Sequence, residues 1–161
     1  MAKKLTHYQA SGFYLISKLQ TGGLKKWGVH ATTTITKGQA LAEDTAGYAT
    51  DMGANLAATF IGIAAEACDN STGAAGAKSV MVIPPFNHNQ FAVPADTATL
   101  AQTDIGELVD TGADGLHIDP SDAVTTGWAF IIDEIDISAE AVAANTRGYA
   151  VGHFEQRAAQ S

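Results

Sequence analysis

Short apolar stretches separated by turn residues predict a chain built largely from strands. The stretch "SVMVIPPF" ends in two prolines, which cannot donate the hydrogen bonds of a sheet, so a strand is expected to end there. "QFAVPA", "IGELVDTG" and "GLHID" follow at spacings of about ten residues, each bounded by Gly, Pro, Asp or Asn. This spacing predicts an all-β fold, either a small β-barrel or a compact sandwich.

The N-terminal half shows the same pattern less clearly. "WGVHATTTIT" is rich in β-branched residues and is closed by "KG", which predicts a strand entering a turn. In "ANLAATFIGIAAEA" the residues Leu56, Phe60 and Ile63 have helical spacing, but the β-branched positions and the following "DNSTGAAG" fit a strand and a long hairpin loop. We favour a strand that starts at about Thr59.

The clearest strand pattern is "GWAFIIDEIDIS". Its first three large apolar residues share one face of an alternating strand, and the two later isoleucines have the opposite parity: Trp128, Phe130 and Ile132, against Ile135 and Ile137. A β-bulge at residues 133–134 would return both isoleucines to the core. After it, "AEAVAAN" fits a helical turn and "RGYAVGHF" a last strand.

These strands predict one interior, in a barrel or between two sheets. It is expected to bury the apolar residues of the late strand and those of the earlier ones: Phe60, Ile61, Val80, Val82, Trp128, Phe130 and Ile132, with some of Ile105, Leu108 and Val109. A chain of 161 residues with 46% hydrophobic content can form one domain that buries roughly 70% of its unfolded surface.

The charge of the chain is unevenly distributed. Residues 1–42 hold six lysines and no acid, whereas the remainder holds three positive residues against all 17 carboxylates, a net charge of −14. Together with the pair Gly22–Gly23, this predicts a basic N-terminal arm at 1–26 on a jointed connection, a β-barrel domain at 27–155 and a polar tail at 156–161.

Lysines and aromatic rings of this arm are the candidate interaction residues. Rings supply large buried area at little entropy cost, so they suit anchors in a groove of another protein, either a neighbouring copy or a different partner. The basic arm could fold onto the acidic body of its own chain or onto that of a neighbour, and we expect neighbouring chains to hold it in place. The candidates are Lys3, Lys4, Tyr8, Phe13, Tyr14, Lys25, Lys26 and Trp27.

Candidate catalytic chemistry is sparse. The lone cysteine, Cys68, stands beside Glu66 and Asp69, which would raise its pKa, and it is interpreted as a small structural residue at a strand end. A single cysteine makes no intrachain disulfide, which favours synthesis in a reducing compartment. The apolar run near the N-terminus is interrupted by Lys18, so neither a signal peptide nor a membrane span is expected.

"HIDPSD" is the best candidate metal or hydrolase site, because a turn could gather His117 with Asp119 and Asp122. The same residues form an ordinary turn sequence, which we favour. No paired His or Cys motif, phosphate loop or nucleophile elbow occurs. We therefore expect no catalytic residues, no metal and no cofactor, and the acidic body disfavours direct contact with nucleic acid.

The order of these segments resembles a known family. "TITKGQALAED", "ATFIGIAAEA", "SVMVIPP", "QFAVPA", "DIGELVDTG" and "GWAFIIDEIDIS" are similar to the small β-barrel decoration proteins, also called cement or head-stabilisation proteins, of tailed bacteriophages. The resemblance covers residues 31–138. It includes an entry turn with Ile35, Gly38 and Leu41, the strand "FIGIA", and a late strand beginning "GELV" at Gly106.

The resemblance implies a non-enzymatic virion protein. Such a protein is made in the host cytoplasm, joins the outer surface of an assembled icosahedral head, and binds the major capsid protein, often as a homotrimer. It implies no membrane partner. Two other classes stay open: a β-barrel ligand or carrier module of a cellular complex, and a small hydrolase that uses His117 with Asp119 or Asp122.

Overall fold

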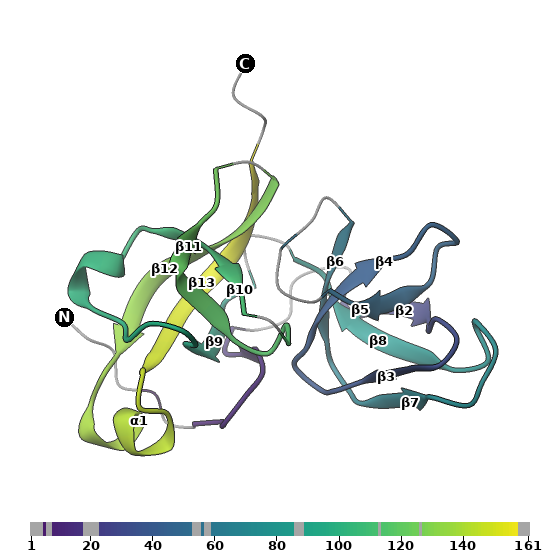
Figure 1. The fold of residues 1–161 in the computed structure, drawn as a ribbon, viewed down its shortest axis with the longest axis horizontal. Helices are drawn as coiled ribbons and strands as arrows, with labels where there is room; N and C mark the ends of the chain where they lie inside the picture. The colour runs from purple at the N-terminus through teal and green to yellow at the C-terminus, as the bar shows by residue number, and fades with distance from the viewer. Residues whose placement is uncertain are drawn as a thin grey trace.

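A computed structural model describes residues 5, 8–17, 23–52, 56, 59–85, 89–112, 114–125 and 127–157. Strands dominate these residues and form three antiparallel sheets, with one α-helix. The predicted all-β fold is therefore confirmed. Within the described residues the sheets stay open and do not close into a barrel. Figure 1 shows two lobes side by side.

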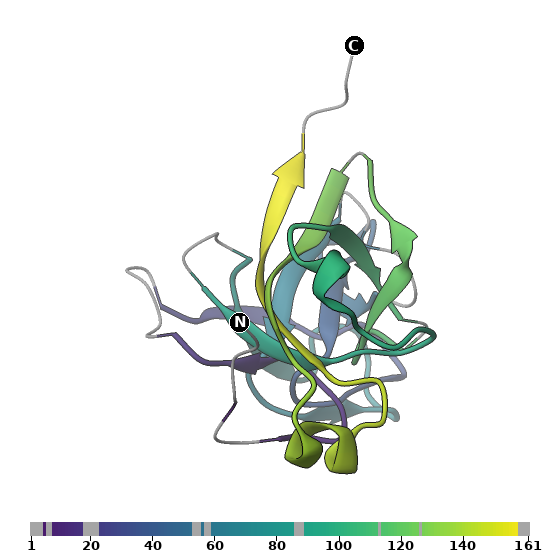
Figure 2. The same ribbon diagram turned by 90° about the vertical axis from the view of Figure 1, so that its left-hand side faces the viewer.

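The first lobe contains a six-stranded sheet and the helix. The order across this sheet is β1 (Tyr14–Leu15), β9 (Phe91–Pro94), β13 (Tyr149–Arg157), β12 (Gly127–Asp136), β10 (Leu108–Thr111) and β11 (Ile118–Ala123). Figure 2 shows β12 and β13 running along the lobe, with α1 (Ala139–Ala144) at the turn between them. A 3-10 turn, η1 (Gln102–Asp104), precedes β10.

The second lobe contains the two smaller sheets. The five-stranded sheet has the order β2 (Lys25–Gly28), β8 (Ser79–Ile83), β6 (Phe60–Ala64), β4 (Ala40–Glu43) and β5 (Ala49–Asp51). The two-stranded sheet pairs β3 (Thr33–Ile35) with β7 (Cys68–Asn70). The expected strand "WGVHATTTIT" is thus two strands, because the chain turns at Thr32, whose φ is +58°.

A core of aromatic rings joins the two lobes. Phe60 of the second lobe lies 4.7 Å from Phe154 and 5.5 Å from Trp128 of the first, measured between ring centroids. Phe130 and Ile132 are fully buried in the same core. Since aromatic pairs at these distances add to the free energy of burial, the lobes form one folding unit.

The predicted single interior is divided among three apolar clusters within the described residues. Val80 and Val82 face a separate core between the five-stranded and two-stranded sheets, which also contains Val29 and Leu41. Four predicted core residues are not fully buried: Ile61, Leu108 and Trp128 are half-buried, and Ile105 is 37% exposed. Separate cores replace one because the chain forms three open sheets rather than one barrel.

The predicted bulge in β12 is confirmed. Ile132 pairs with Gly152 and Glu134 pairs with Val151, so Asp133 is the extra residue in the ladder. The shift returns Ile135 to the core, where it is fully buried. Ile137 does not follow it and stays 40% exposed, because β12 ends at Asp136.

The described part of the N-terminal segment packs on its own chain. Strand β1 pairs with β9, so the chain starts in the first lobe, crosses to the second at β2 and returns at β9. Phe13 is 3% exposed and contacts the rings of Phe91, Phe130 and Phe154. The sequence predicted instead an arm held by neighbouring chains. The segment packs on its own chain because the ring of Phe13 is buried in this chain's core.

Candidate interaction surface

The structure does not gather the described candidate residues at one site. Lys3 and Lys4 fall outside the described residues. Phe13 is part of the core, and Trp27 is half-buried against the core of the second lobe. The remaining four, Tyr8, Tyr14, Lys25 and Lys26, are treated in turn below.

Tyr8 is fixed by a buried carboxylate. Its hydroxyl donates to Asp136 Oδ2 at 2.6 Å, and the backbone N–H of Leu5 donates to the same oxygen at 2.6 Å. The Tyr8 ring lies 5.1 Å from the ring of Tyr149, whose hydroxyl donates to the carbonyl of Gln9. Tyr8 is therefore a structural contact between the N-terminal segment and the end of β12.

Burial and hydrogen bonding act in opposite directions on the pKa of Asp136. Burial raises the pKa of Asp136, but the hydrogen bonds from Tyr8, Leu5 and Ser138 outweigh it and hold that pKa below its ordinary value. Burial, followed by the hydrogen bond to Asp136, raises the pKa of the Tyr8 hydroxyl. The carboxylate is thus ionised and the phenol neutral across the ordinary pH range.

A pocket of about 160 Å³ lies where the N-terminal segment meets the second lobe. Two backbone bonds fix its geometry: Phe13 N–H donates to the carbonyl of Gly38 at 2.8 Å, and Gly38 N–H to that of Ala64 at 2.8 Å. Gly38 has φ +83°, and a Cβ there would lie 3.1 Å from the backbone of Phe13. The lining is mostly apolar and comes from Gln9, Phe13, Tyr14, Leu15, Lys37, Ala64, Ala65 and Ile83.

We call this the Lys37 pocket and consider next its rim. Lys37 is exposed, and Tyr14 is 38% exposed. Lys26 lies opposite Met81 in the β2–β8 pair, on the sheet face that Ile83 of the lining also occupies. The pocket is thus bordered by Lys37 and Tyr14, and Lys26 lies beside it on the neighbouring strand of the same sheet face.

Other groups at this rim modify its character. Leu24, just before β2, is 38% exposed. Glu66 is the acidic group nearby, and one of its carboxylate oxygens accepts the backbone N–H of Met81 at 3.1 Å. Lys25 lies opposite the buried Val82 and so belongs to the other face of β2. The two neighbouring lysines of β2 are thus separated by the alternation of the strand.

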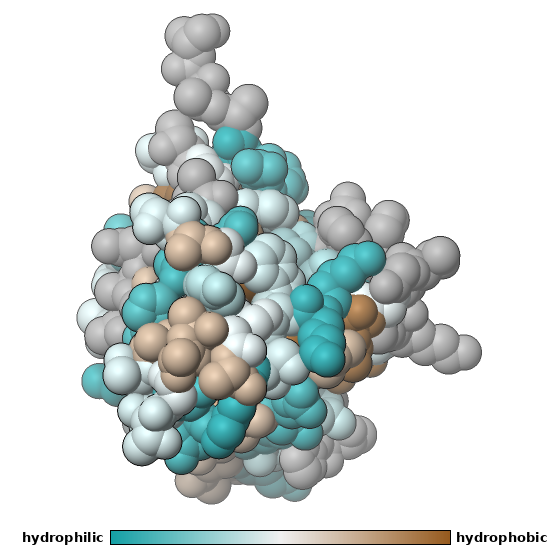
Figure 3. Space-filling model, turned by 90° about the vertical axis from the view of Figure 1, so that its right-hand side faces the viewer, coloured by the Kyte–Doolittle hydropathy of each residue, from teal (hydrophilic) through white to brown (hydrophobic). Residues whose placement is uncertain are grey.

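The surface on the side of the second lobe is a mosaic. Figure 3 shows hydrophobic spots bordered by strongly hydrophilic side chains rather than one continuous apolar face. Scattered apolar side chains of this kind are normal on protein surfaces, so this face does not by itself mark a binding site.

Cys68 is a core residue. Its side chain is 9% exposed and packs in the core of the second lobe. Burial is the main cause that raises the pKa of its thiol, and Glu66 and Asp69 add to it, while Lys78 acts in the opposite direction. A thiol held protonated is a poor nucleophile, which agrees with the structural interpretation made from the sequence.

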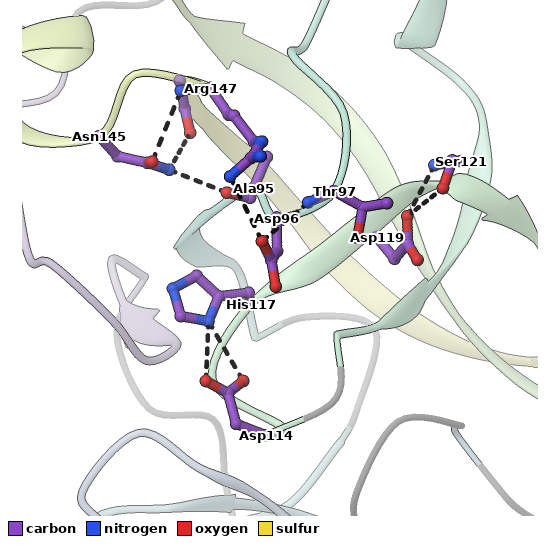
Figure 4. A network of polar contacts seen from close by, with 10 residues as sticks. Ala95, Asp96, Thr97, Asp114, His117, Asp119, Ser121, Asn145 and Arg147 are labelled. Carbon is purple, nitrogen blue, oxygen red and sulfur yellow. Dashed lines mark hydrogen bonds and ion pairs between the residues drawn. The ribbon is translucent and has the colours of Figure 1, made fainter.

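His117 is paired with a residue that the sequence did not suggest. Its Nδ1 lies 3.1 Å from both carboxylate oxygens of Asp114, whereas Asp119 accepts hydrogen bonds from Ser121. Figure 4 shows His117 between Asp96 and Asp114, with Asp119 directed elsewhere. Among the described residues, no three His, Cys, Asp or Glu side chains are grouped so as to hold a metal ion.

The favoured turn at residues 119–122 lies inside β11. Val109 pairs with Ala123 and Asp110 with Asp119, so the residues between Asp119 and Ala123 are looped out as a bulge. The strand pairs with β10 on both sides of this bulge. The local bond from Ser121 N–H to Asp119 is the kind of contact that made these residues resemble a turn.

In the part of the chain that the structure describes, no helix is long and apolar enough to cross a membrane. Comparisons with protein-family models, with curated proteins and with solved structures gave no match. The function is therefore inferred from the geometry of this chain and from the resemblance described above.

Proposed function

We propose that the protein is a non-enzymatic structural component of a phage virion. It binds the outside of an icosahedral head, as an oligomer and by resemblance a trimer, and stabilises the head by bridging major capsid protein subunits. The Lys37 pocket and its rim form the docking surface, against either the capsid or a sister subunit.

The observation that carries this proposal is the size and setting of the pocket. Sites for small molecules have volumes of about 300–1,000 Å³, whereas this pocket has about 160 Å³. It suits a single apolar side chain of a protein partner. Tyr14 and Lys37 of the lining, with Lys26 on the neighbouring strand, add an aromatic anchor and positive charge to a chain whose net charge is −8.

The enzyme alternative has less support. A hydrolase needs a nucleophile or an activated water beside a base, within hydrogen-bond reach. His117 faces Asp114 and not Asp119, and Cys68 is buried with a raised pKa. A ligand or carrier module would need an enclosed pocket or an exposed attachment site, and the larger hollow of the first lobe, about 390 Å³ beside Ile105 and Val124, is wide open to solvent.

The test is co-sedimentation with undecorated heads at low and high salt. The intact protein should bind, and it should raise the temperature at which the heads break down. Tyr14→Ala combined with Lys26→Gln and Lys37→Gln should weaken attachment, by about 1–3 kcal/mol, since aromatic anchors contribute more than exposed charges.

Lys25→Gln provides the matched control, because this lysine adjoins Lys26 but lies on the other face of β2. It should bind heads like the unaltered protein. Failure of the intact protein to bind any head would remove the decoration proposal. Full binding by the triple variant would assign attachment to another surface.

A further inference from the structure

An exposed isoleucine lies on a loop of the first lobe. Ile105 is 37% exposed and follows η1 in the segment 101–107, which we call the Ile105 loop. Its side chain borders an open hollow of about 390 Å³ that Glu107 and Val124 also line. Gly106 N–H donates to the carbonyl of Ile132 at 2.7 Å, and Ile132 N–H donates to that of Glu107 at 3.1 Å, so the loop is fastened to β12 directly after Ile105.

The N-terminal side of this loop is fixed as well. Asp104 Oδ2 accepts the backbone N–H of Ala101 at 2.7 Å, and Asp104 N–H donates to the carbonyl of Ala101 at 3.0 Å. An exposed apolar side chain held in one position loses little conformational entropy on binding, which is a property of anchoring residues.

Acidic groups flank this isoleucine. Asp104 precedes it directly and Glu107, which is exposed, follows two residues later. The Lys37 pocket has the opposite character, with a mostly apolar interior of single-side-chain size and Lys37 in its lining, and Lys26 lies on the neighbouring strand of the same sheet face. One surface thus offers an exposed side chain and the other a cavity, and their charges are opposite.

We propose that the Lys37 pocket receives the Ile105 side chain of a second copy of this chain, with Glu107 of that copy facing Lys37 and Lys26. This rests on the proposed function, because it names a sister subunit as the partner of the same surface. The capsid then contacts other parts of the oligomer.

The positions of the two surfaces determine the kind of assembly. In Figure 1 the teal-green η1 lies at the outer end of the first lobe, while the Lys37 pocket lies where the N-terminal segment meets the second lobe. A contact between two different surfaces is head-to-tail, and it produces a ring if the rotation closes or an open chain if it does not. A closed ring of three copies would satisfy every pocket.

Sedimentation velocity of the purified protein without heads tests the contact itself. Ile105→Asp should weaken self-association by about 10- to 100-fold, which corresponds to the loss of one buried aliphatic side chain. Ile137→Asp is the matched control, because Ile137 is 40% exposed but lies beyond the end of β12. It should associate like the unaltered protein.

A charge exchange tests the direction of the contact. Lys37→Glu and Glu107→Lys should each weaken self-association, and an equal mixture of the two variants should recover it in part. A contact between the two variants pairs opposite charges again, but a ring of three copies that contains both variants has two matched contacts and one mismatched contact. Glu155→Lys, an exposed change on β13, should not substitute for Glu107→Lys in the mixture.

The outcomes separate this proposal from the proposed function. A protein that remains monomeric at all concentrations yet binds heads would overturn the sister-subunit contact and leave the decoration function standing. Self-association that Ile105→Asp abolishes, in a protein that binds no head, would support the contact and remove the decoration function. Equal effects of Ile105→Asp and Ile137→Asp would also overturn the contact.

Discussion

The buried carboxylate of Asp136 provides the sharpest test of how the N-terminal segment is held. Asp136 is fully buried, and its Oδ2 accepts hydrogen bonds from Leu5 N–H and the Tyr8 hydroxyl while its Oδ1 accepts Ser138 N–H at 3.0 Å. Asp136→Asn keeps the shape but replaces one acceptor oxygen with an NH₂ donor. At least one buried donor then loses its partner.

The magnitude follows from those contacts. Hydrogen bonds to a charged group contribute about 1.5–3 kcal/mol each, and a neutral acceptor retains about 1 kcal/mol of this. With two donors on one oxygen and a third on the other, Asp136→Asn should lower the free energy of unfolding by about 2–4 kcal/mol. For a chain of this size the melting temperature should fall by about 5–15 °C.

The pH dependence gives the test its specificity. The pKa of Asp136 is lowered in the folded state relative to about 3.9 in an unfolded chain. Its stabilising effect is therefore fully present above that unfolded value and is lost as pH falls through the folded pKa. The difference in stability between the unaltered protein and Asp136→Asn should be largest near pH 7 and should shrink below pH of about 4.

Urea unfolding at several pH values measures this difference, and Tyr8→Phe serves as a second variant. It removes one donor but keeps the ring on Tyr149, so it should cost about 1–2 kcal/mol. The reasoning would be refuted by an Asp136→Asn protein of unchanged stability at pH 7, or by a loss of stability that is the same at pH 7 and pH 3.

Two further predictions concern the cores. Phe13→Ala should destabilise the fold by about 3–5 kcal/mol in urea unfolding, since it empties a buried ring site; a protein that melts like the unaltered one would contradict the assigned packing. Cys68→Ser should cost only about 1 kcal/mol and leave head attachment unchanged. The native Cys68 thiol should react slowly with iodoacetamide at pH 8, and labelling as fast as in denaturant would show that it is accessible.

The strands that could be predicted from the sequence are those with local signals. Pro84 ends β8 as expected, and the phase change in β12 identifies the bulge at Asp133, because alternation depends on the strand alone. Only the start of β11 was predicted, within "GLHID", since its Asp119–Pro120 sequence is typical of a turn and the strand resumes only through pairing with β10 at Ala123. Local patterns carry no information on such a partner.

The candidate surface was only partly predictable for the same reason. Tyr14 and Lys26 were named from their residue types, but the pocket beside them also needs Lys37, Ala65 and Ile83, which are distant in sequence. Nor could spacing show that His117 pairs with Asp114 rather than with Asp119. That choice depends on Ser121, which occupies the Asp119 carboxylate.

The N-terminal segment combines two roles that a deletion cannot separate. Phe13 points into the aromatic core, and Tyr14, the next residue in an extended chain, points outward to the rim of the pocket. Removing residues 1–26 would therefore remove a core ring together with the expected anchor, and a loss of binding would follow from unfolding alone. Only substitutions on the exposed side of the strand, such as Tyr14→Ala, can attribute a loss of attachment to the surface, and Phe13→Ala shows what a failure of the core looks like.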